Sequence, residues 1–273
     1  MSQARLVVVA LIALALSGCS APPQPKPVQP DLPQLGLLGM WRVTAEGVDT
    51  DTWLRLGDGA VILAPDCDLE GGWLATETEF VADVLMWSGE CEGLERQPAP
   101  WLTTATTYSS VGTGWQLLDA DGAVTATLTD DGWPEGTSET AEEALAPPTV
   151  TTAFRARYAE PAPLRAGLRR ADADALIGRW VPELATTVAP HLRFTDDRTV
   201  RTSDGCNVTT GRWLVTERGT LVTTGYSSTL VGCDGIDVVG ALDKAVTAAI
   251  DGDGSLHLIS ASGAELLTFV RDE

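Results

Sequence analysis

Five cysteines are the residues of this 273-residue chain whose spacing indicates chemistry most directly. Cys67 and Cys91 lie 24 positions apart, and Cys206 and Cys233 lie 27 positions apart. A zinc site favours CxxC-type spacing with further His or Cys ligands, and none of these lies nearby in the sequence. In an oxidising compartment, four cysteines instead predict two disulfides, for which three connectivities are open. We therefore expect no metal at these cysteines, and no other motif predicts a cofactor.

The fifth cysteine, Cys19, follows a short apolar segment. Arg5 precedes an apolar run from Leu6 to Leu16 that is too short to span a bilayer. Leu16-Ser17-Gly18-Cys19 resembles the lipobox of bacterial lipoproteins. The resemblance implies that residues 1–18 are a lipoprotein signal peptide and that Cys19 is lipidated. The alternative is an ordinary secretory signal with an incidental cysteine.

Residues 19–34 are rich in proline, which favours an extended polyproline II conformation. We interpret them as a tether between the lipid and the folded part of the chain. Two or three acyl chains anchor a protein stably, whereas one chain binds only transiently. The sequence therefore predicts a protein attached to the cell membrane through its N-terminal lipid, outside the cytoplasm.

Charge and motifs argue against several classes of function. The chain has 38 acidic and 18 basic residues and a formal charge of −20, whereas nucleic acids and anionic headgroups require basic patches. It also lacks a GxSxG elbow, a P-loop and a GxGxxG motif. We therefore expect no nucleic-acid partner and no enzymatic activity, and we assign no catalytic residues.

The chain contains two copies of one sequence pattern, at residues 35–128 (the first unit) and 175–273 (the second unit). Six groups of residues recur in order at offsets of 138 to 142 positions: Leu37-Leu38-Gly39-Met40-Trp41 with Leu176-Ile177-Gly178-Arg179-Trp180, Leu54-Arg55-Leu56 with Leu192-Arg193-Phe194, Asp66-Cys67-Asp68 with Gly205-Cys206-Asn207, Gly71-Gly72-Trp73-Leu74 with Gly211-Arg212-Trp213-Leu214, Cys91 with Cys233, and Trp115-Gln116-Leu117-Leu118 with Leu256-His257-Leu258-Ile259. A duplication favours the pairs Cys67–Cys91 and Cys206–Cys233, since each unit then closes on itself.

Each unit has the pattern of an antiparallel β structure. Apolar residues alternate with polar ones, as in Leu192-Arg193-Phe194, and turn residues separate the short runs. Asp119-x-Asp121-Gly122 and Asp251-x-Asp253-Gly254 lack the later ligands of a calcium loop and are better explained as hairpin turns. Apolar residues at three- and four-residue steps from Val238 to Ala249 predict a short helix with Asp237 as its cap.

The second unit resembles the META/HslJ domain in the order and spacing of its motifs. The resemblance rests on Leu176-x-Gly178-x-Trp180, Gly205-Cys206-Asn207 with Gly211-x-Trp213, Cys233, the helix, and Gly254-x-Leu256-x-Leu258. It implies a mainly β fold, with two small barrel-like antiparallel units in tandem, each with a short helix. The first unit departs from the pattern, because Asp66 stands at the place of Gly205 and Asp68 at that of Asn207. The family implies a role in the bacterial envelope or in stress tolerance, and it has no catalytic residues to transfer.

Residues 129–174 form an acidic linker with a short predicted helix. Thr149 is a candidate cap, and Val150, Phe154 and Tyr158 would lie on one helical face that must pack against a domain. Arg165, Arg169 and Arg170 follow the helix. Contact of these arginines with the acidic first unit and a plain flexible connection are both open.

Six of the nine tryptophans lie in the first unit. The repeat places most of them at core positions, which leaves Trp53 and Trp87 as the expected exposed pair. Exposed indole rings stack on sugars, so this pair is the candidate ligand-binding site.

The leading functional hypothesis is a lipid-anchored envelope protein with a non-enzymatic binding, assembly or stress-tolerance role. Its partner would be an unidentified envelope protein or glycan. The alternative is a glycan- or peptidoglycan-binding module that uses Trp53 and Trp87. An unrecognised hydrolase with paired carboxylates is the least favoured hypothesis.

Overall fold

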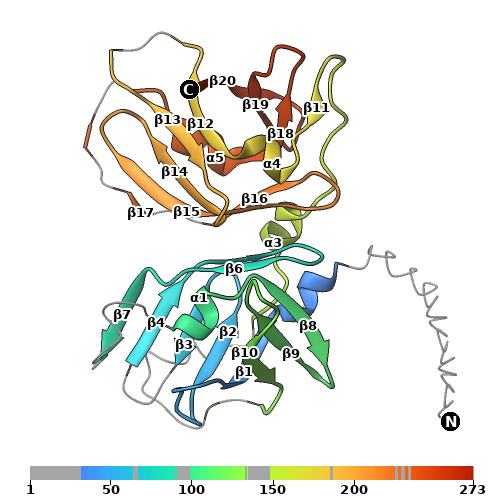
Figure 1. Cartoon of the computed structure of the whole chain (residues 1–273), viewed down its shortest axis with the longest axis vertical. Helices are drawn as coiled ribbons and strands as arrows, with labels where there is room; N and C mark the ends of the chain where they lie inside the picture. Colours follow the sequence, from blue (N-terminus) through green and yellow to red (C-terminus); the bar gives the residue numbers. More distant parts are fainter. Residues whose placement is uncertain are drawn as a thin grey trace, which may run out of the picture. The chain divides into compact units, whose positions relative to one another are not determined.

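The first unit is built around one eight-stranded antiparallel sheet that curls into a half-barrel (Figure 1). Its strand order is β7-β4-β3-β2-β1-β10-β9-β8. The strands are β1 (Gly39–Thr44), β2 (Trp53–Leu56), β3 (Ala60–Leu63), β4 (Cys67–Gly71), β7 (Met86–Gly89), β8 (Thr107–Val111), β9 (Gly114–Leu118) and β10 (Val124–Thr129). A separate hairpin of β5 (Trp73–Ala75) and β6 (Phe80–Ala82), a 3-10 helix η1 (Pro33–Leu37) and the short helix α1 (Pro100–Thr103) complete the unit.

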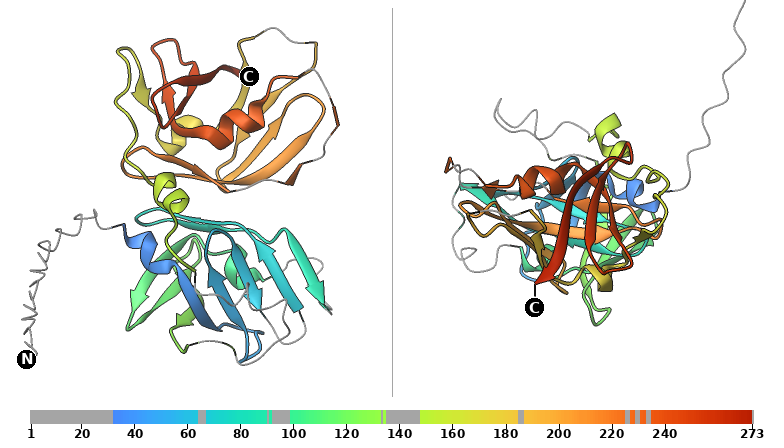
Figure 2. Two further views of the ribbon diagram at one scale, coloured as in Figure 1. Left: turned by 180° about the vertical axis from the view of Figure 1, so that it is seen from behind. Right: turned by 90° about the horizontal axis from the view of Figure 1, so that it is seen from above.

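The second unit has a ten-stranded sheet whose main order is β11-β18-β19-β20-β12-β13-β14-β15-β16, with β17 paired to β15. The strands are β11 (Arg169–Arg170), β12 (Gly178–Pro182), β13 (His191–Phe194), β14 (Thr199–Ser203), β15 (Val208–Val215), β16 (Leu221–Thr223), β17 (Ser227–Ser228), β18 (Ala245–Ile250), β19 (Leu256–Ser260) and β20 (Glu265–Asp272). Helix α4 (Ala173–Leu176) precedes the sheet. Helix α5 (Val238–Lys244) packs against β14, β19 and β20 (Figure 2). The mainly β fold class is confirmed.

This computed structural model describes residues 32–63, 67–89, 91, 99–132, 134, 148–184, 187–224, 227–228, 231–232 and 235–272. Residues 32–273 form one compact unit. The predicted signal peptide, Cys19 and most of the tether therefore lie outside the described residues, as does Cys233. In the part of the chain that is described, no helix is long and apolar enough to cross a membrane.

The two large sheets have the same strand order around β1 and β12. In the first unit β1 is followed outward by β2, β3, β4 and β7 on one side and by β10, β9 and β8 on the other. In the second unit β12 is followed by β13, β14, β15 and β17 on one side and by β20, β19 and β18 on the other. The indole N–H of Trp41 donates to the Leu37 carbonyl, and the indole N–H of Trp180 donates to the Leu176 carbonyl, both at 2.8 Å. The two matched tryptophans thus make matched hydrogen bonds.

The hairpin turns follow the predicted acidic sequences. In both turns the first aspartate, Asp119 or Asp251, accepts hydrogen bonds from backbone N–H groups two and four residues later. Gly122 and Gly254 adopt positive φ angles of 77° and 86°, which glycine tolerates without strain. The carboxylates are therefore used to build hairpins.

Two helix predictions need correction. The predicted helix from Val238 to Ala249 ends at Lys244, because the chain becomes extended at Ala245 and forms strand β18 with buried pairing to β19. The linker helix α3 (Thr152–Arg157) is capped by Thr151, whose hydroxyl accepts from the Phe154 N–H at 3.0 Å, and not by Thr149.

The face of the linker helix packs as predicted. Phe154 and Tyr158 are buried in the hydrophobic core of the first unit, and Val150 packs against it. The Phe154 ring lies 5.9 Å from the ring of Trp73, which is itself fully enclosed. The linker therefore contributes to the core of the first unit.

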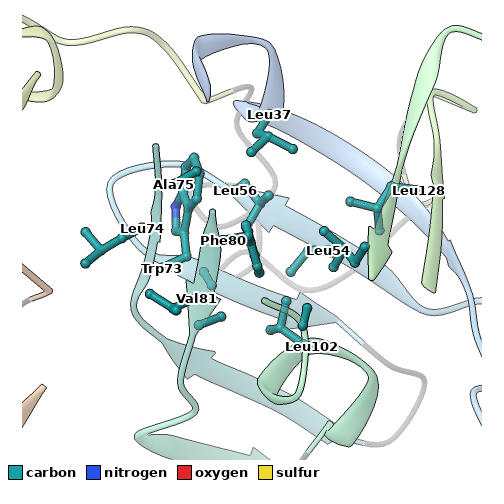
Figure 3. Close-up of a cluster of buried hydrophobic side chains, with 14 of the residues drawn as sticks. Leu37, Leu54, Leu56, Trp73, Leu74, Ala75, Phe80, Val81, Leu102 and Leu128 are labelled. Atoms are coloured by element: carbon teal, nitrogen blue, oxygen red, sulfur yellow. The ribbon is translucent and has the colours of Figure 1, made fainter. Parts of the chain in front are cut away.

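The core of the first unit is filled by leucines and aromatic rings between the sheet, the β5–β6 hairpin and α1. Figure 3 shows Leu54, Leu56, Phe80 and Leu102 gathered in this space. Two side chains of the second unit, Leu214 and Val222, belong to the same cluster. Strands β15 and β16 thus bury both faces, since the neighbouring Trp213 and Leu221 point into the core of the second unit.

Candidate functional site

Strand β7 forms one edge of the sheet in the first unit, and it pairs with β4. Met86 and Trp87 are 59% and 54% exposed, and every residue of the strand is exposed. Large apolar side chains at an unprotected sheet edge are unusual, because such an edge is a template for pairing with another chain. The exposed edge strand Met86–Gly89 is therefore the candidate functional surface, called the β7 edge below.

The β7 edge has one apolar and one acidic face. Trp87 pairs with Leu69, whose side chain is buried in the core, so the indole lies on the inner face of the sheet. Met86 pairs with Glu70, and Ser88 pairs with Asp68, on the outer face. Burial raises the pKa of the Asp68 carboxyl above its ordinary value, and the charge of Glu70 raises it further.

A disulfide fastens this edge to the sheet. Cys67 is bonded to Cys91, which confirms the predicted pair in the first unit. Cys67 is also the register partner of Gly89 at the end of β7. The strand therefore keeps its place in the sheet although it buries none of its own side chains.

The second unit carries a matched but polar edge. In the first unit, Leu69 and Glu70 of β4 pair with Trp87 and Met86 of β7. In the second unit, Thr209 and Thr210 of β15 pair with Ser228 and Ser227 of β17. The apolar pair of the first unit is thus replaced by two serines in the second. Cys206 is disulfide-bonded. Its predicted partner, Cys233, lies outside the described residues, so this pairing stays a prediction.

The prediction that Trp53 and Trp87 form an exposed pair is wrong for Trp53. Trp53 is only 3% exposed, because β2 is an inner strand flanked by β1 and β3. The guanidinium of Arg42 also lies over its ring, 5.0 Å from the centroid. Trp41, Trp73 and Trp101 are buried as the repeat predicts, whereas Trp115 is only partly buried. Trp87 is the exposed indole of the first unit.

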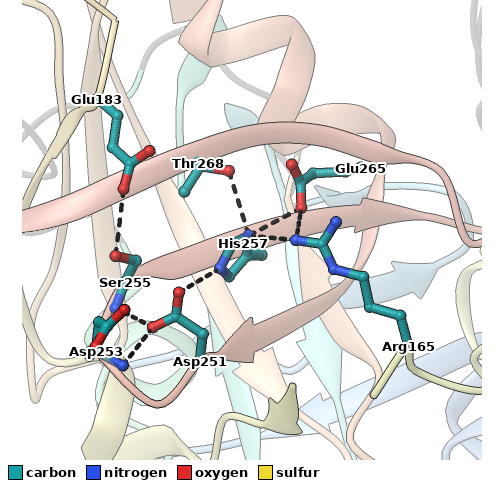
Figure 4. A network of polar contacts seen from close by, with 8 residues as sticks. All are labelled: Arg165, Glu183, Asp251, Asp253, Ser255, His257, Glu265 and Thr268. Carbon is teal, nitrogen blue, oxygen red and sulfur yellow. Dashed lines mark hydrogen bonds and ion pairs between the residues drawn. The ribbon is translucent and has the colours of Figure 1, made fainter. Parts of the chain in front are cut away.

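The most connected polar cluster of the described chain surrounds His257, to which the sequence assigned no role (Figure 4). Its Nδ1 lies 2.9 Å from Glu265 and its Nε2 lies 3.2 Å from Asp251, while Thr268 contacts Nδ1 at 3.2 Å. Hydrogen bonds from the Ser255 backbone N–H and then from the His257 ring lower the pKa of Asp251.

Arg165 completes this cluster by pairing with Glu265 at 2.6 Å. Arg165, for which the sequence left contact with the first unit open, thus binds the second unit. Both nitrogens of the His257 ring are occupied by protein groups, and the nearby Ser255 hydroxyl donates to Glu183. The arrangement ties the linker to the second unit and presents no activated nucleophile. No spacing rule could find it, because its members come from two hairpins and the linker.

A polar contact joins the first unit to the second. Both Nε and Nη2 of Arg198 donate to Glu79 Oε1, at 3.0 and 2.7 Å. Arg198 adopts a left-handed φ of 63°, and its guanidinium lies 5.1 Å from the centroid of the Trp213 ring. The pair borders a cleft of about 560 Å³. Arg198 belongs to the second unit and Glu79 to the first, so this ion pair fastens the two units together.

Asp83 lies close to the same junction. Its Oδ1 accepts a hydrogen bond from the Gly72 N–H at 2.7 Å. Burial raises the pKa of this carboxyl, while that hydrogen bond and the charge of Arg212 oppose the rise. A group of three or more His, Cys, Asp or Glu residues placed to hold a metal ion does not occur among the residues described.

Comparison with known proteins identifies the second unit. Residues 174–273 match the META domain, the family that the second unit resembles. No curated protein matches the chain, and no solved structure does.

Proposed function

We propose that this chain is a lipid-anchored protein of the cell envelope with a non-enzymatic binding role, and that its first unit carries the binding surface. The single observation that carries the binding role is the exposure of Met86 and Trp87 on the β7 edge. Covering two half-exposed side chains of this size would contribute on the order of 1–3 kcal/mol to an association. The META domain in the second unit is consistent with a binding or stress-related role.

The comparison between the units strengthens this proposal. The residues at the matched position of the second unit are serines, so the same strand order forms there without apolar residues at this position. Met86 and Trp87 are therefore explained by binding more readily than by folding.

The first unit is proposed to be a divergent copy of the META domain. Support comes from the common strand order of the two sheets and from the matched hydrogen bonds of Trp41 and Trp180. Lipidation of Cys19 belongs to the same proposal and rests on the lipobox-like sequence. A proline-rich tether of about 16 residues would reach roughly 50 Å from its lipid anchor.

The test is photo-crosslinking in native membranes. A photo-reactive benzoylphenylalanine replaces Trp87 in the full chain, and the control carries it at Val124, which is equally exposed on another strand. We expect a discrete protein adduct from position 87 and none from position 124. A glycan adduct from position 87 would favour the glycan-binding alternative, and equal labelling at both positions would contradict a binding role for the β7 edge.

A further inference from the structure

We infer that the β7 edge binds an extended peptide as an added β-strand, and that this peptide alternates basic and apolar side chains. The inference rests on the proposed function, because it names the chemistry of the partner of the same surface. It is carried by the backbone of β7, by the two faces of the strand and by the disulfide beside it.

The backbone of β7 supplies the first argument. On one side the strand pairs with β4, and none of the other described strands pairs with its second side. The sequence Met86-Trp87-Ser88-Gly89 contains no Lys and no Pro, which are the residues that protect sheet edges from pairing. Among the described strands, the second side of β7 is therefore left to an added strand.

The two faces of the sheet define the side chains of the peptide. On the inner face, a peptide residue opposite Trp87 would extend an apolar surface and should itself be apolar. On the outer face, residues opposite Met86 and Ser88 would lie two strands from Glu70 and Asp68, at roughly 10 Å. Lys or Arg side chains are long enough to lean across Met86 and Ser88 toward these carboxylates.

Charge complementarity selects the basic peptide over two other occupants. Residues 19–154 carry 22 acidic and only 4 basic residues, so an anionic lipid surface would be repelled. A second copy of this chain paired through the same edge would place two sets of Asp68 and Glu70 on one sheet. Asp68 and Glu70 already stand on one strand face, where burial first and then the charge of Glu70 raise the pKa of Asp68, and a nearby cation would favour the ionised carboxylate.

The disulfide Cys67–Cys91 prepares the strand for binding. It lies at the end of β7 where Cys67 and Gly89 are register partners. An edge strand that is held by a covalent bond loses little conformational freedom when a peptide pairs with it. The apolar residues can therefore remain exposed without loss of the strand.

The test is isothermal titration of the full-length protein in neutral detergent with a synthetic heptapeptide, Thr-Lys-Val-Lys-Val-Lys-Thr. We expect binding that weakens at least about tenfold, or about 1.4 kcal/mol, in the double variants Met86→Ser/Trp87→Ser and Asp68→Asn/Glu70→Gln. The first variant introduces the two serines that stand at the matched position in β17 (Ser227–Ser228), which pairs with β15, so we expect β7 to stay paired with β4. Glu46→Gln/Asp253→Asn removes the same number of negative charges at two exposed sites and should bind like wild type.

The backbone requirement is tested with the same peptide carrying N-methyl groups at alternate residues. Strand addition predicts loss of binding for the peptide methylated on its pairing edge, and protection of β7 amides from hydrogen exchange by the unmodified peptide. Equal binding of all methylated peptides, unchanged affinity in Asp68→Asn/Glu70→Gln, or no binding would overturn the inference. If position 87 still crosslinks to an envelope protein in that case, the binding role stands and only strand addition is rejected.

Discussion

Substitution of Leu214 by alanine tests whether the two units share one hydrophobic core. Leu214 lies on β15 of the second unit and is fully buried, as is its cross-strand partner Val222. Both belong to the cluster that contains Leu74 and Val81 of the first unit, which are paired across the β5–β6 hairpin in the same way. The two hairpins thus bury equivalent leucine–valine pairs in one cluster.

The expected cost follows from this burial. Replacing a buried leucine by alanine costs about 2–5 kcal/mol, because apolar contacts are lost and a cavity remains. The neighbours of Leu214 stand on regular hairpins and have little freedom to fill the space, so we expect about 3 kcal/mol. If the units were independent, Leu214 would be a surface residue and the change would stay within about 0.5 kcal/mol.

The assay is guanidinium unfolding of the full chain followed by tryptophan fluorescence, which reports mainly on the first unit because six of the nine tryptophans lie there. Val208→Ala is the matched control, since Val208 lies on the same strand and is 46% exposed. We expect Leu214→Ala to shift the transition and Val208→Ala to leave it unchanged. Equal effects of the two substitutions would refute the shared core.

Four further outcomes are expected. Cys91→Ser should lower the free energy of unfolding by about 3–4 kcal/mol, since it opens the disulfide loop, and an unchanged denaturation midpoint would contradict this. Arg198→Ala should cost about 1–2 kcal/mol through the lost ion pair with Glu79 and the lost cation–π contact. Arg198→Gly should cost about 0.5–1 kcal/mol less, because glycine accepts the left-handed φ, and the reverse order in urea titrations would refute this. Burial raises the pKa of Asp83, so the folded state binds the carboxyl proton more tightly than the unfolded chain does. The protonated carboxyl therefore stabilises the fold fully below pH 3.8. This contribution is lost as pH rises through the folded pKa. Wild type should therefore gain stability relative to Asp83→Asn between pH 7 and pH 4, and a constant difference in urea midpoints would argue against it. Cys19→Ala should abolish acylation and release the protein from membranes, whereas an unmodified Cys19 in the mass spectrum of the native protein would exclude the anchor.

Much of the fold could be predicted from local sequence patterns. Alternation of apolar and polar residues marks strands that bury one face, as at Leu192 and Phe194, and both are buried. The repeat predicted the Cys67–Cys91 disulfide and the burial of Trp41, because equivalent positions in two copies must fill equivalent cores. The helix from Val238 was predicted too long, since alanines and valines fit a buried strand as well as a helix.

The candidate site could be predicted only in part. The sequence identified Trp87, but it gave Trp53 the same expected exposure. Burial of a strand residue depends on whether its strand lies inside the sheet or at the edge, and pairing between distant segments decides this. The cluster around His257 likewise depends on two hairpins and the linker meeting at one place.

The sequence by itself determined the antiparallel β character of the chain, because it follows from a period of two, and the repeated pattern predicted the pairing of Cys67 with Cys91. The tertiary structure decided which apolar side chains serve the core and which serve the surface. Leu214 and Trp213 are neighbours in one apolar run, yet they enter two different cores, since successive side chains of a strand point to opposite faces. Met86 and Trp87 remain exposed because β7 lies at the edge of its sheet, and this edge is defined only once the other strands have paired.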